Sequence, residues 1–144
     1  MTGSSPARLY AALVGGALVI AGIIGFFYEA SFETGNDIRA DAVFGILDVN
    51  GWHNLFHIAT GLLGLAAAGY AARTYALAFG LFYVLIAIWG FLETDNGFGA
   101  ILDVIPVNTE DNFLHLILGL TGLAAGAATP KEPSRLRPAP RRAA

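Results

Sequence analysis

Long apolar runs alternate with acidic polar stretches along the whole chain. The first run, Leu9 to Tyr28, carries no charge and as a helix would cover about 30 Å, the thickness of the hydrocarbon core of a bilayer. Only Arg73 and Thr74 separate the second run from the third, so we expect the chain to double back there as a tight antiparallel hairpin. The pattern predicts four membrane spans, at residues 9–28, 52–72, 75–92 and 111–128.

The second and fourth runs begin with related sequences. HNLFHIATGLLGLAAAG, from His53 to Gly69, recurs as DNFLHLILGLTGLAAG, from Asp111 to Gly126. The tetrapeptide ILDV also occurs twice, at Ile46 to Val49 and Ile101 to Val104, before each copy. With four spans the two copies point the same way across the bilayer. The sequence therefore predicts an all-α integral membrane four-helix bundle built from two tandem, parallel-repeat helical hairpins.

Composition supports a membrane protein. Of 144 residues, 56% are hydrophobic and 13% charged, and the mean hydropathy is +0.61, all displaced from soluble-domain averages. The absence of cysteine excludes a disulfide framework, a thiolate metal site and a cysteine nucleophile.

Charge is segregated between the two sides of the expected bundle. Seven of the eight Lys and Arg residues fall with the termini and the Arg73 turn, while ten of the eleven Asp and Glu residues fall with the two long loops. The positive-inside rule then predicts a multi-pass protein with both termini in the cytoplasm. We expect a cytoplasmic N-terminus (1–8), a membrane domain (9–128) and a basic, disordered cytoplasmic tail (129–144). The acidic loops are read as solvated connections outside.

All three histidines lie at the outer ends of the second and fourth spans. His53 and His57, four residues apart, share one helix face, and Asp111 and His115 repeat this spacing. If the two faces meet, these side chains offer three imidazoles and a carboxylate to a divalent ion such as Zn(II) or Cu(II), or imidazoles to a haem. The sequence alone does not choose between these cofactors.

A structural interpretation of the same residues is simpler. Helix starts near the headgroups hold His and Asp at little cost, and an i,i+4 pair is a weak metal signal. Asn54 and Asn112 are then expected to donate hydrogen bonds between helices. In the metal hypothesis, Glu29 and Glu93 end the other spans at the same level and could serve as further ligands or as hydrogen-bond acceptors for the ligands.

Small residues mark the faces on which the helices are expected to pack. Gly64-x-x-x-Ala68 and Gly122-x-x-x-Gly126 occupy equivalent positions in the second and fourth spans. We interpret both as packing contacts within the chain rather than as a dimer interface.

HNLFH…GLLGLA and PVNTEDNFLHLILGL, joined by FYVLIAIWGF, resemble the bacterial four-span membrane protein family catalogued as domain of unknown function 4383 (DUF4383). The resemblance covers Leu9 to about Ala128. It implies a small protein of the bacterial plasma membrane and no assigned activity. The matching positions are His53, Asn54, His57 and Gly61 in the first copy, and Pro106, Asn108, Thr109, Asp111, Asn112, His115 and Gly119 in the second.

Three functional hypotheses follow. The first is a non-enzymatic accessory or envelope-associated component, because the chain shows no nucleophile motif, phosphate loop or redox cysteine. The second is a metal- or haem-binding protein using the histidines. The third, a small transporter or channel, is least favoured because the spans carry no buried charged path. The bilayer is the expected partner, nucleic acid is not, and a membrane-protein partner and a homo-oligomer both stay open.

Overall fold

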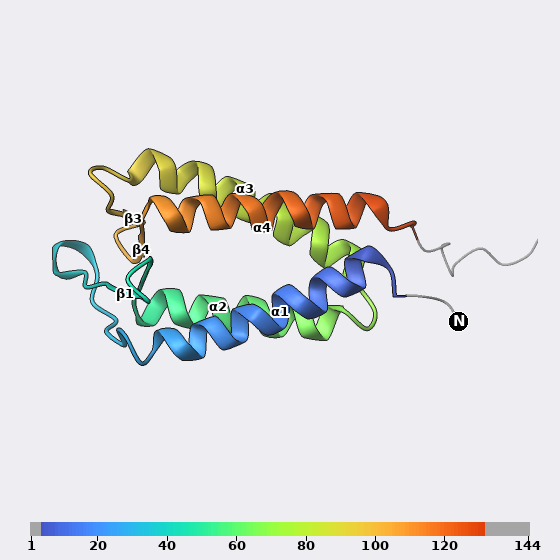
Figure 1. The fold of residues 1–144 in the computed structure, drawn as a ribbon, viewed down its shortest axis with the longest axis horizontal. Helices are drawn as coiled ribbons and strands as arrows, with labels where there is room; N and C mark the ends of the chain where they lie inside the picture. Colours follow the sequence, from blue (N-terminus) through green and yellow to red (C-terminus); the bar gives the residue numbers. More distant parts are fainter. Residues whose placement is uncertain (1–3, 132–144) are drawn as a thin grey trace, which may run out of the picture.

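The structure is a computed structural model that describes residues 4–131. The expected disordered tail therefore lies, from residue 132 onwards, outside the described residues. Two antiparallel β-hairpins connect the helices of each pair, and a 3-10 turn, η1 (Gly35–Asp37), precedes the first (Figure 1). The elements are α1 (Pro6–Gly25), β1 (Asp41–Val43), β2 (Leu47–Val49), α2 (Gly51–Ala67), α3 (Ala72–Glu93), β3 (Gly99–Ile101), β4 (Ile105–Val107) and α4 (Thr109–Ala128).

Helix starts follow local sequence signals. Ser5 caps α1, which begins with a proline, the residue best suited to a first helical turn. Asn50 caps α2 and Asn108 caps α4, each accepting a hydrogen bond from the backbone N–H three residues on. At α4 the Asp111 side chain also accepts from the Asn108 backbone N–H, which completes a capping box.

The long loops are more ordered than the sequence predicted. Val43 and Val49 of the first β-hairpin, and Ile101 and Val107 of the second, are buried, so the loops fold back over the helix ends instead of being fully solvated. The two ILDV segments are also not structural equivalents. The first supplies all of β2, whereas Ile101 ends β3 and the rest of the second segment forms the following turn.

The helices pair differently from the expected central hairpin. α1 packs along α2 and α3 along α4, while α2 and α3 touch little beyond their short turn, so the prediction of a tight hairpin between them was wrong. Glycines allow α1 to pack closely on α2, and α3 on α4. A Cβ on Gly15 would lie 2.8 Å from the Gly61 carbonyl oxygen, and one on Gly80 would lie 2.8 Å from that of Gly119. Backbones approach this closely only where side chains are absent.

The two helix pairs cross near the chain termini and separate toward the β-hairpins, where β2 lies against β4 (Figure 1). Aromatic rings fill the crossing. Phe79 stacks on Tyr83 with ring centroids 4.1 Å apart and meets Tyr10 edge-on at 6.2 Å. Tyr10 donates a hydrogen bond to the Leu118 carbonyl on α4, and Tyr75 donates one to the Thr60 carbonyl on α2. Each pair is thereby joined to the other.

The small-residue motifs pack within the chain, as predicted. A Cβ on Gly122 would lie 2.7 Å from the Tyr10 hydroxyl, and one on Gly64 would lie 2.6 Å from the Tyr75 hydroxyl. Both glycines therefore receive the tyrosine of the opposite helix pair.

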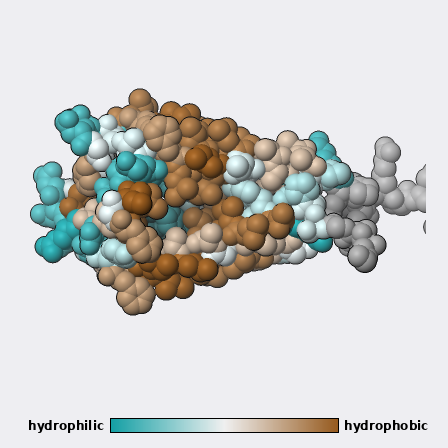
Figure 2. Space-filling view, viewed as in Figure 1, coloured by the Kyte–Doolittle hydropathy of each residue, from teal (hydrophilic) through white to brown (hydrophobic). Residues whose placement is uncertain are grey.

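Apolar side chains face outwards on every helix. By length and composition, α1 and α3 could each cross a membrane. Figure 2 shows hydrophobic surface over the middle of the helices and hydrophilic side chains gathered at the loop end. Exposed large apolar residues include Leu13, Ile20 and Ile23 on α1, Leu55, Leu62 and Leu63 on α2, Leu81, Leu85 and Ile88 on α3, and Leu114, Ile117 and Leu120 on α4.

Candidate metal centre

Three imidazoles converge where the helix pairs separate. His53 and His57 come from the first two turns of α2, and His115 comes from the second turn of α4. Each offers one ring nitrogen to a set whose members all lie within 4.8 Å of one another. The ring centroids are 4.4 Å apart for His53 and His57, 5.8 Å for His53 and His115, and 6.3 Å for His57 and His115. The two histidine faces therefore meet, which was the condition for the metal hypothesis.

His53 is fixed by the loop before α2. Its Nδ1 lies 2.9 Å from the carbonyl oxygen of Asp48. A carbonyl can only accept, so the ring proton is on Nδ1 and Nε2 keeps its lone pair. Metal-bound histidines commonly donate their second N–H to a backbone carbonyl in this way. The ring of His53 is therefore oriented as a ligand.

His115 is buried and makes no side-chain hydrogen bond to another described residue. The residue is 5% exposed, and its Nδ1 is buried without a hydrogen-bond partner in the structure. Its ring meets Tyr83 edge-on at 5.2 Å. Because buried polar atoms nearly always have a partner, this nitrogen points to a ligand.

Asp111 does not join the imidazoles, which corrects the predicted fourth ligand. Its Oδ2 accepts hydrogen bonds from the backbone N–H of Asn108 at 3.0 Å and from that of Asp48 at 2.9 Å. The carboxylate thus closes the capping box of α4. Asp111 reaches the cluster indirectly, through the Asp48 residue whose carbonyl orients His53.

Asn54 and Asn112 bridge within the helix pairs, as predicted. Asn54 Nδ2 donates to the Glu29 carbonyl just beyond α1, and Asn112 Nδ2 donates to the Thr94 hydroxyl just beyond α3, both at 2.8 Å. The side chains of the two glutamates expected near the cluster are engaged elsewhere. Glu29 accepts from the Ser31 N–H, and Glu93 accepts from the Trp89 indole.

Sequence reasoning missed two residues that shape the site. Asp48 acts through its backbone, which residue type does not reveal. Burial raises the pKa of the Asp48 carboxyl, Asn108 lowers it, and Glu110 and Asp41 raise it further. Tyr83, on α3, is 1% exposed and packs on His115. A tyrosine in the middle of an apolar span was the available signal.

The donor set suits a divalent transition metal. A tetrahedral ion holds imidazole nitrogens at about 2.0–2.1 Å, so neighbouring nitrogens would lie about 3.3 Å apart. In the structure the candidate ligand atoms lie within 4.8 Å of one another, so an ion would have to draw them closer. Three imidazoles leave one coordination position for another ligand.

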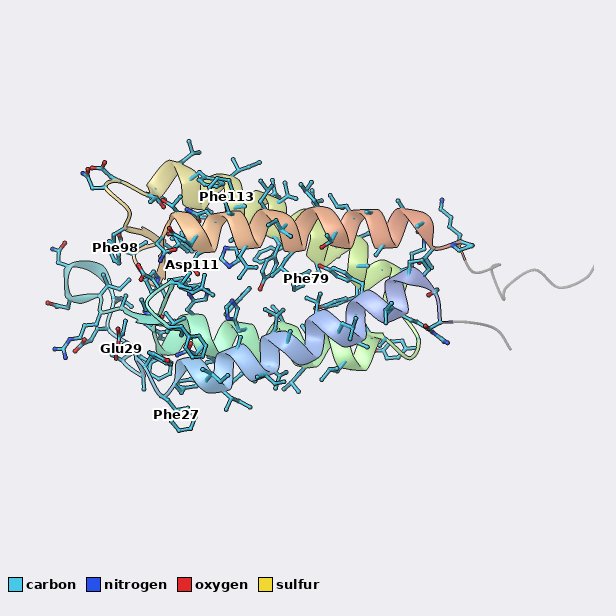
Figure 3. All side chains as sticks on the ribbon, in the orientation of Figure 1. Phe27, Glu29, Phe79, Phe98, Asp111 and Phe113 are labelled. Atoms are coloured by element: carbon cyan, nitrogen blue, oxygen red, sulfur yellow. The ribbon has the colours of Figure 1, made fainter. Side chains whose placement is uncertain are left out.

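Two cavities flank the histidines, and His57 and His115 line both. One, of about 640 Å³, lies between α1 and α4 under the first β-hairpin. The other, of about 200 Å³, is aromatic and lies between α2 and α3, beside Phe56, Tyr83 and Trp89. Figure 3 places Asp111 at the loop end and Phe79 farther along the bundle, toward the crossing.

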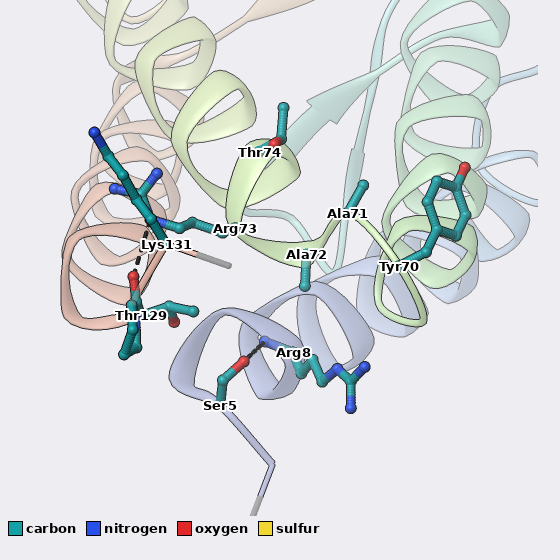
Figure 4. Close-up of a pocket in the computed structure, with 10 residues that line it drawn as sticks. Ser5, Arg8, Tyr70, Ala71, Ala72, Arg73, Thr74, Thr129 and Lys131 are labelled. Atoms are coloured by element: carbon teal, nitrogen blue, oxygen red, sulfur yellow. Dashed lines mark hydrogen bonds between the residues drawn. The ribbon is translucent and has the colours of Figure 1, made fainter. Parts of the chain in front are cut away.

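A polar cavity of about 350 Å³ occupies the opposite end, near the termini (Figure 4). Arg8, Arg73 and Lys131 line it. Arg73 Nε donates to the Thr129 carbonyl, and the Thr129 hydroxyl accepts from the Ala7 N–H, each at 2.9 Å. These bonds tie the start of α1 and the start of α3 to the end of α4.

The fold and cluster define a small, mostly helical protein with two helices apolar enough to cross a membrane and three clustered imidazoles. The chain belongs to the family described as Domain of unknown function (DUF4383), whose model matches residues 8–128. This match covers α2, α3, α4 and all but the first two residues of α1, and it confirms the resemblance to this family seen in the sequence. Neither a curated protein nor a solved structure matches the chain.

Proposed function

We propose that this is a multi-pass protein of the bacterial plasma membrane in which all four helices cross the bilayer. Exposed Leu, Ile and Phe side chains on every helix would form a large apolar patch in water, which soluble monomers avoid. Close glycine contacts between helices fit association in lipid. Acidic loops at one end and basic residues at the other support cytoplasmic termini.

The matched contacts support two tandem, parallel repeats. The Gly15–Gly61 and Gly80–Gly119 approaches, and the two tyrosine-to-carbonyl bonds between the helix pairs, recur at equivalent positions. Repeats related by an axis along the membrane normal would place both β-hairpins on one side.

Cysteine labelling tests this topology, because the chain has no cysteine of its own. Single cysteines at Glu33 and Asp95, one in each acidic loop, should react with an impermeant maleimide in intact cells. A cysteine at Tyr70, in the α2–α3 turn, should react only after permeabilisation. Labelling of Glu33 and Asp95 positions from opposite sides would reject the four-span arrangement.

We propose that the role of this membrane protein is to bind a divalent transition metal at His53, His57 and His115. The carrying observation is that three ring nitrogens from two helices come within 4.8 Å, with His53 already oriented by a carbonyl. The adjoining cavities are mainly apolar and aromatic, as is usual for sites that bind small molecules.

Elemental analysis of protein purified without a histidine tag tests the metal proposal. We expect about one zinc or copper ion per chain, lost in His57→Ala and His115→Ala and retained in Asp95→Ala, which alters an exposed loop residue. Unchanged metal content in His115→Ala would refute the site. A Soret band, with no stoichiometric free-ion metal, would assign the histidines to haem instead.

A further inference from the structure

The larger cavity beside the histidines is open toward the outside of the bundle. Leu13, Ile20 and Phe44 line it and are 63%, 60% and 74% exposed, so its mouth lies along α1 and the first β-hairpin. Its volume of about 640 Å³ falls within the usual range for small-molecule sites, roughly 300–1,000 Å³. In the proposed membrane arrangement this mouth faces the hydrocarbon core, so a ligand would enter from the lipid.

The residues that line the cavity are apolar along most of its length and polar at one end. On α1 the cavity runs from Leu13 to Ile24, about 16 Å along a helix at about 1.5 Å per residue. The polar members of its lining are His57, His115 and Asp111, at the loop end. This shape suits a molecule with one apolar chain and one small polar head.

The polar end selects an uncharged head. Of the described residues, no Lys or Arg lines the cavity, whereas Asp111 does, so an anionic head would lack a counter-charge. The buried Nδ1 of His115 lacks a hydrogen-bond partner in the structure. A neutral oxygen, either a carbonyl that accepts from an imidazole N–H or a hydroxyl that donates to its lone pair, would satisfy it.

We propose that the cavity between α1 and α4 binds a lipid-soluble, uncharged, single-chain molecule whose carbonyl or hydroxyl oxygen lies against His57 and His115. Chain-bearing quinones and long-chain alcohols share this chemistry. The inference rests on the membrane placement in the proposed function and does not require the metal ion.

Native mass spectrometry of metal-free protein in detergent tests the proposal with three probes. A benzoquinone and an alcohol, each with a ten-carbon chain, present the two oxygen types, and decylbenzene presents the chain without oxygen. We expect saturable binding of one oxygen-bearing molecule per chain, with decylbenzene weaker. His115→Leu should weaken the oxygen-bearing probe by roughly two- to tenfold and leave decylbenzene unchanged.

Cavity-filling variants test the location. Ala17 lines the cavity, so Ala17→Phe should lower probe affinity at least tenfold, while Ala12→Phe, on α1 but outside the lining, should leave it unchanged. If Ala17→Phe does not fold, Ala21→Phe serves the same purpose, since Ala21 also lines the cavity.

Wild-type affinity retained in the cavity-filling variant, or equal binding of decylbenzene and the oxygen-bearing probes, would overturn the inference. Cysteine labelling and metal analysis report separately on topology and on the ion. A chain that binds the probe but no metal would refute only the metal proposal.

Discussion

Asn50 and Asn108 each cap one helix and reach into the loop that precedes the other. Asn50 Nδ2 donates to the Val104 carbonyl at 2.8 Å, and Asn108 Nδ2 donates to the Ile46 carbonyl at 2.7 Å. Their Oδ1 atoms meanwhile accept from the first turns of α2 and α4. These two reciprocal hydrogen bonds hold the loop before α2 and the loop before α4 together at the end of the bundle that carries the histidines.

Replacing Asn108 with alanine should therefore destabilise the protein by about 1–3 kcal/mol. The change removes a helix cap, worth about 1 kcal/mol, and leaves the Ile46 carbonyl without its partner. Unfolding in detergent, followed by circular dichroism, measures the loss. Asn36→Ala, in the exposed turn η1, is the control and should stay within about 0.5 kcal/mol of wild type. Equal stability of the two variants would argue against these reciprocal hydrogen bonds.

Gly90 is a second position at which a substitution should lower the stability of the protein. A Cβ there would overlap the Oδ1 of Asn112, whose Nδ2 is already bonded to Thr94. Gly90→Ala should therefore destabilise the α3–α4 pair by about 1–3 kcal/mol, the usual range for overpacking. Gly16→Ala meets open space and should be neutral or stabilise by up to about 1 kcal/mol. Denaturation midpoints of both variants in the same detergent decide the matter.

The carboxyl of Asp48 should make stability depend on pH. Burial raises its pKa, so the folded protein holds this proton more tightly than the unfolded chain does. Its stabilising contribution is complete below the ordinary pKa, near about 4, and is lost as pH rises through the elevated value. Asp48→Asn, which stays uncharged, should therefore melt higher than wild type at pH 8 and lose that advantage at pH 3. Asp37→Asn, at an exposed position of the same loop, is the control.

Threonine 129 should contribute to the end of the bundle near the termini. Thr129→Val removes the acceptor of the buried Ala7 N–H and should cost about 1–2 kcal/mol. Thr34→Val, at an exposed position whose hydroxyl makes no cap hydrogen bond, is the control and should be almost neutral. Equal losses of stability in the two variants, measured by thermal unfolding, would contradict a stabilising hydrogen bond from the Ala7 N–H to the Thr129 hydroxyl.

Removing the metal should lower stability only when the histidines are intact. At an ion concentration 100 times Kd, binding stabilises the folded state by about 2.7 kcal/mol, so chelation should lower the melting temperature of the wild type. His57→Ala should not respond to chelation. A wild-type melting curve that is the same with zinc, copper or chelator would contradict metal binding at the histidines.

The sequence located the four helices because their signals are long, but it misplaced the turn between α2 and α3. That turn lies at residues 68–71, and Arg73 and Thr74, where the sequence predicted it, belong to α3. Uninterrupted apolar runs locate α1 and α3, and the recurrence of Asn54 and His57 as Asn112 and His115 locates α2 and α4 with their polar ends. The strands were missed because three residues are too few to show alternation. The pairing of the helices was predicted wrongly because the short connection between α2 and α3 was given more weight than the glycines on α1–α2 and α3–α4 that allow close approach.

Asp111 shows why the candidate site was only partly predictable. Its spacing from His115 equals that of His53 from His57, which favours a shared ligand role. Yet Asn108 stands three residues before Asp111, and that spacing is the capping pattern the carboxylate adopts. The local signal was present in the sequence: the carboxylate accepts from the backbone N–H of Asn108 at the helix start, and also from that of Asp48 in β2. The carbonyl of Asp48, in contrast, has no signature that residue types can reveal.

A row of rings runs from Tyr10 through Phe79 and Tyr83 to His115, joining the crossing to the imidazoles without a break. Because each ring packs on the next, the position of the His115 imidazole depends on side chains as far away as the crossing. A smaller residue at Phe79 or Tyr83 would remove the packing behind that imidazole.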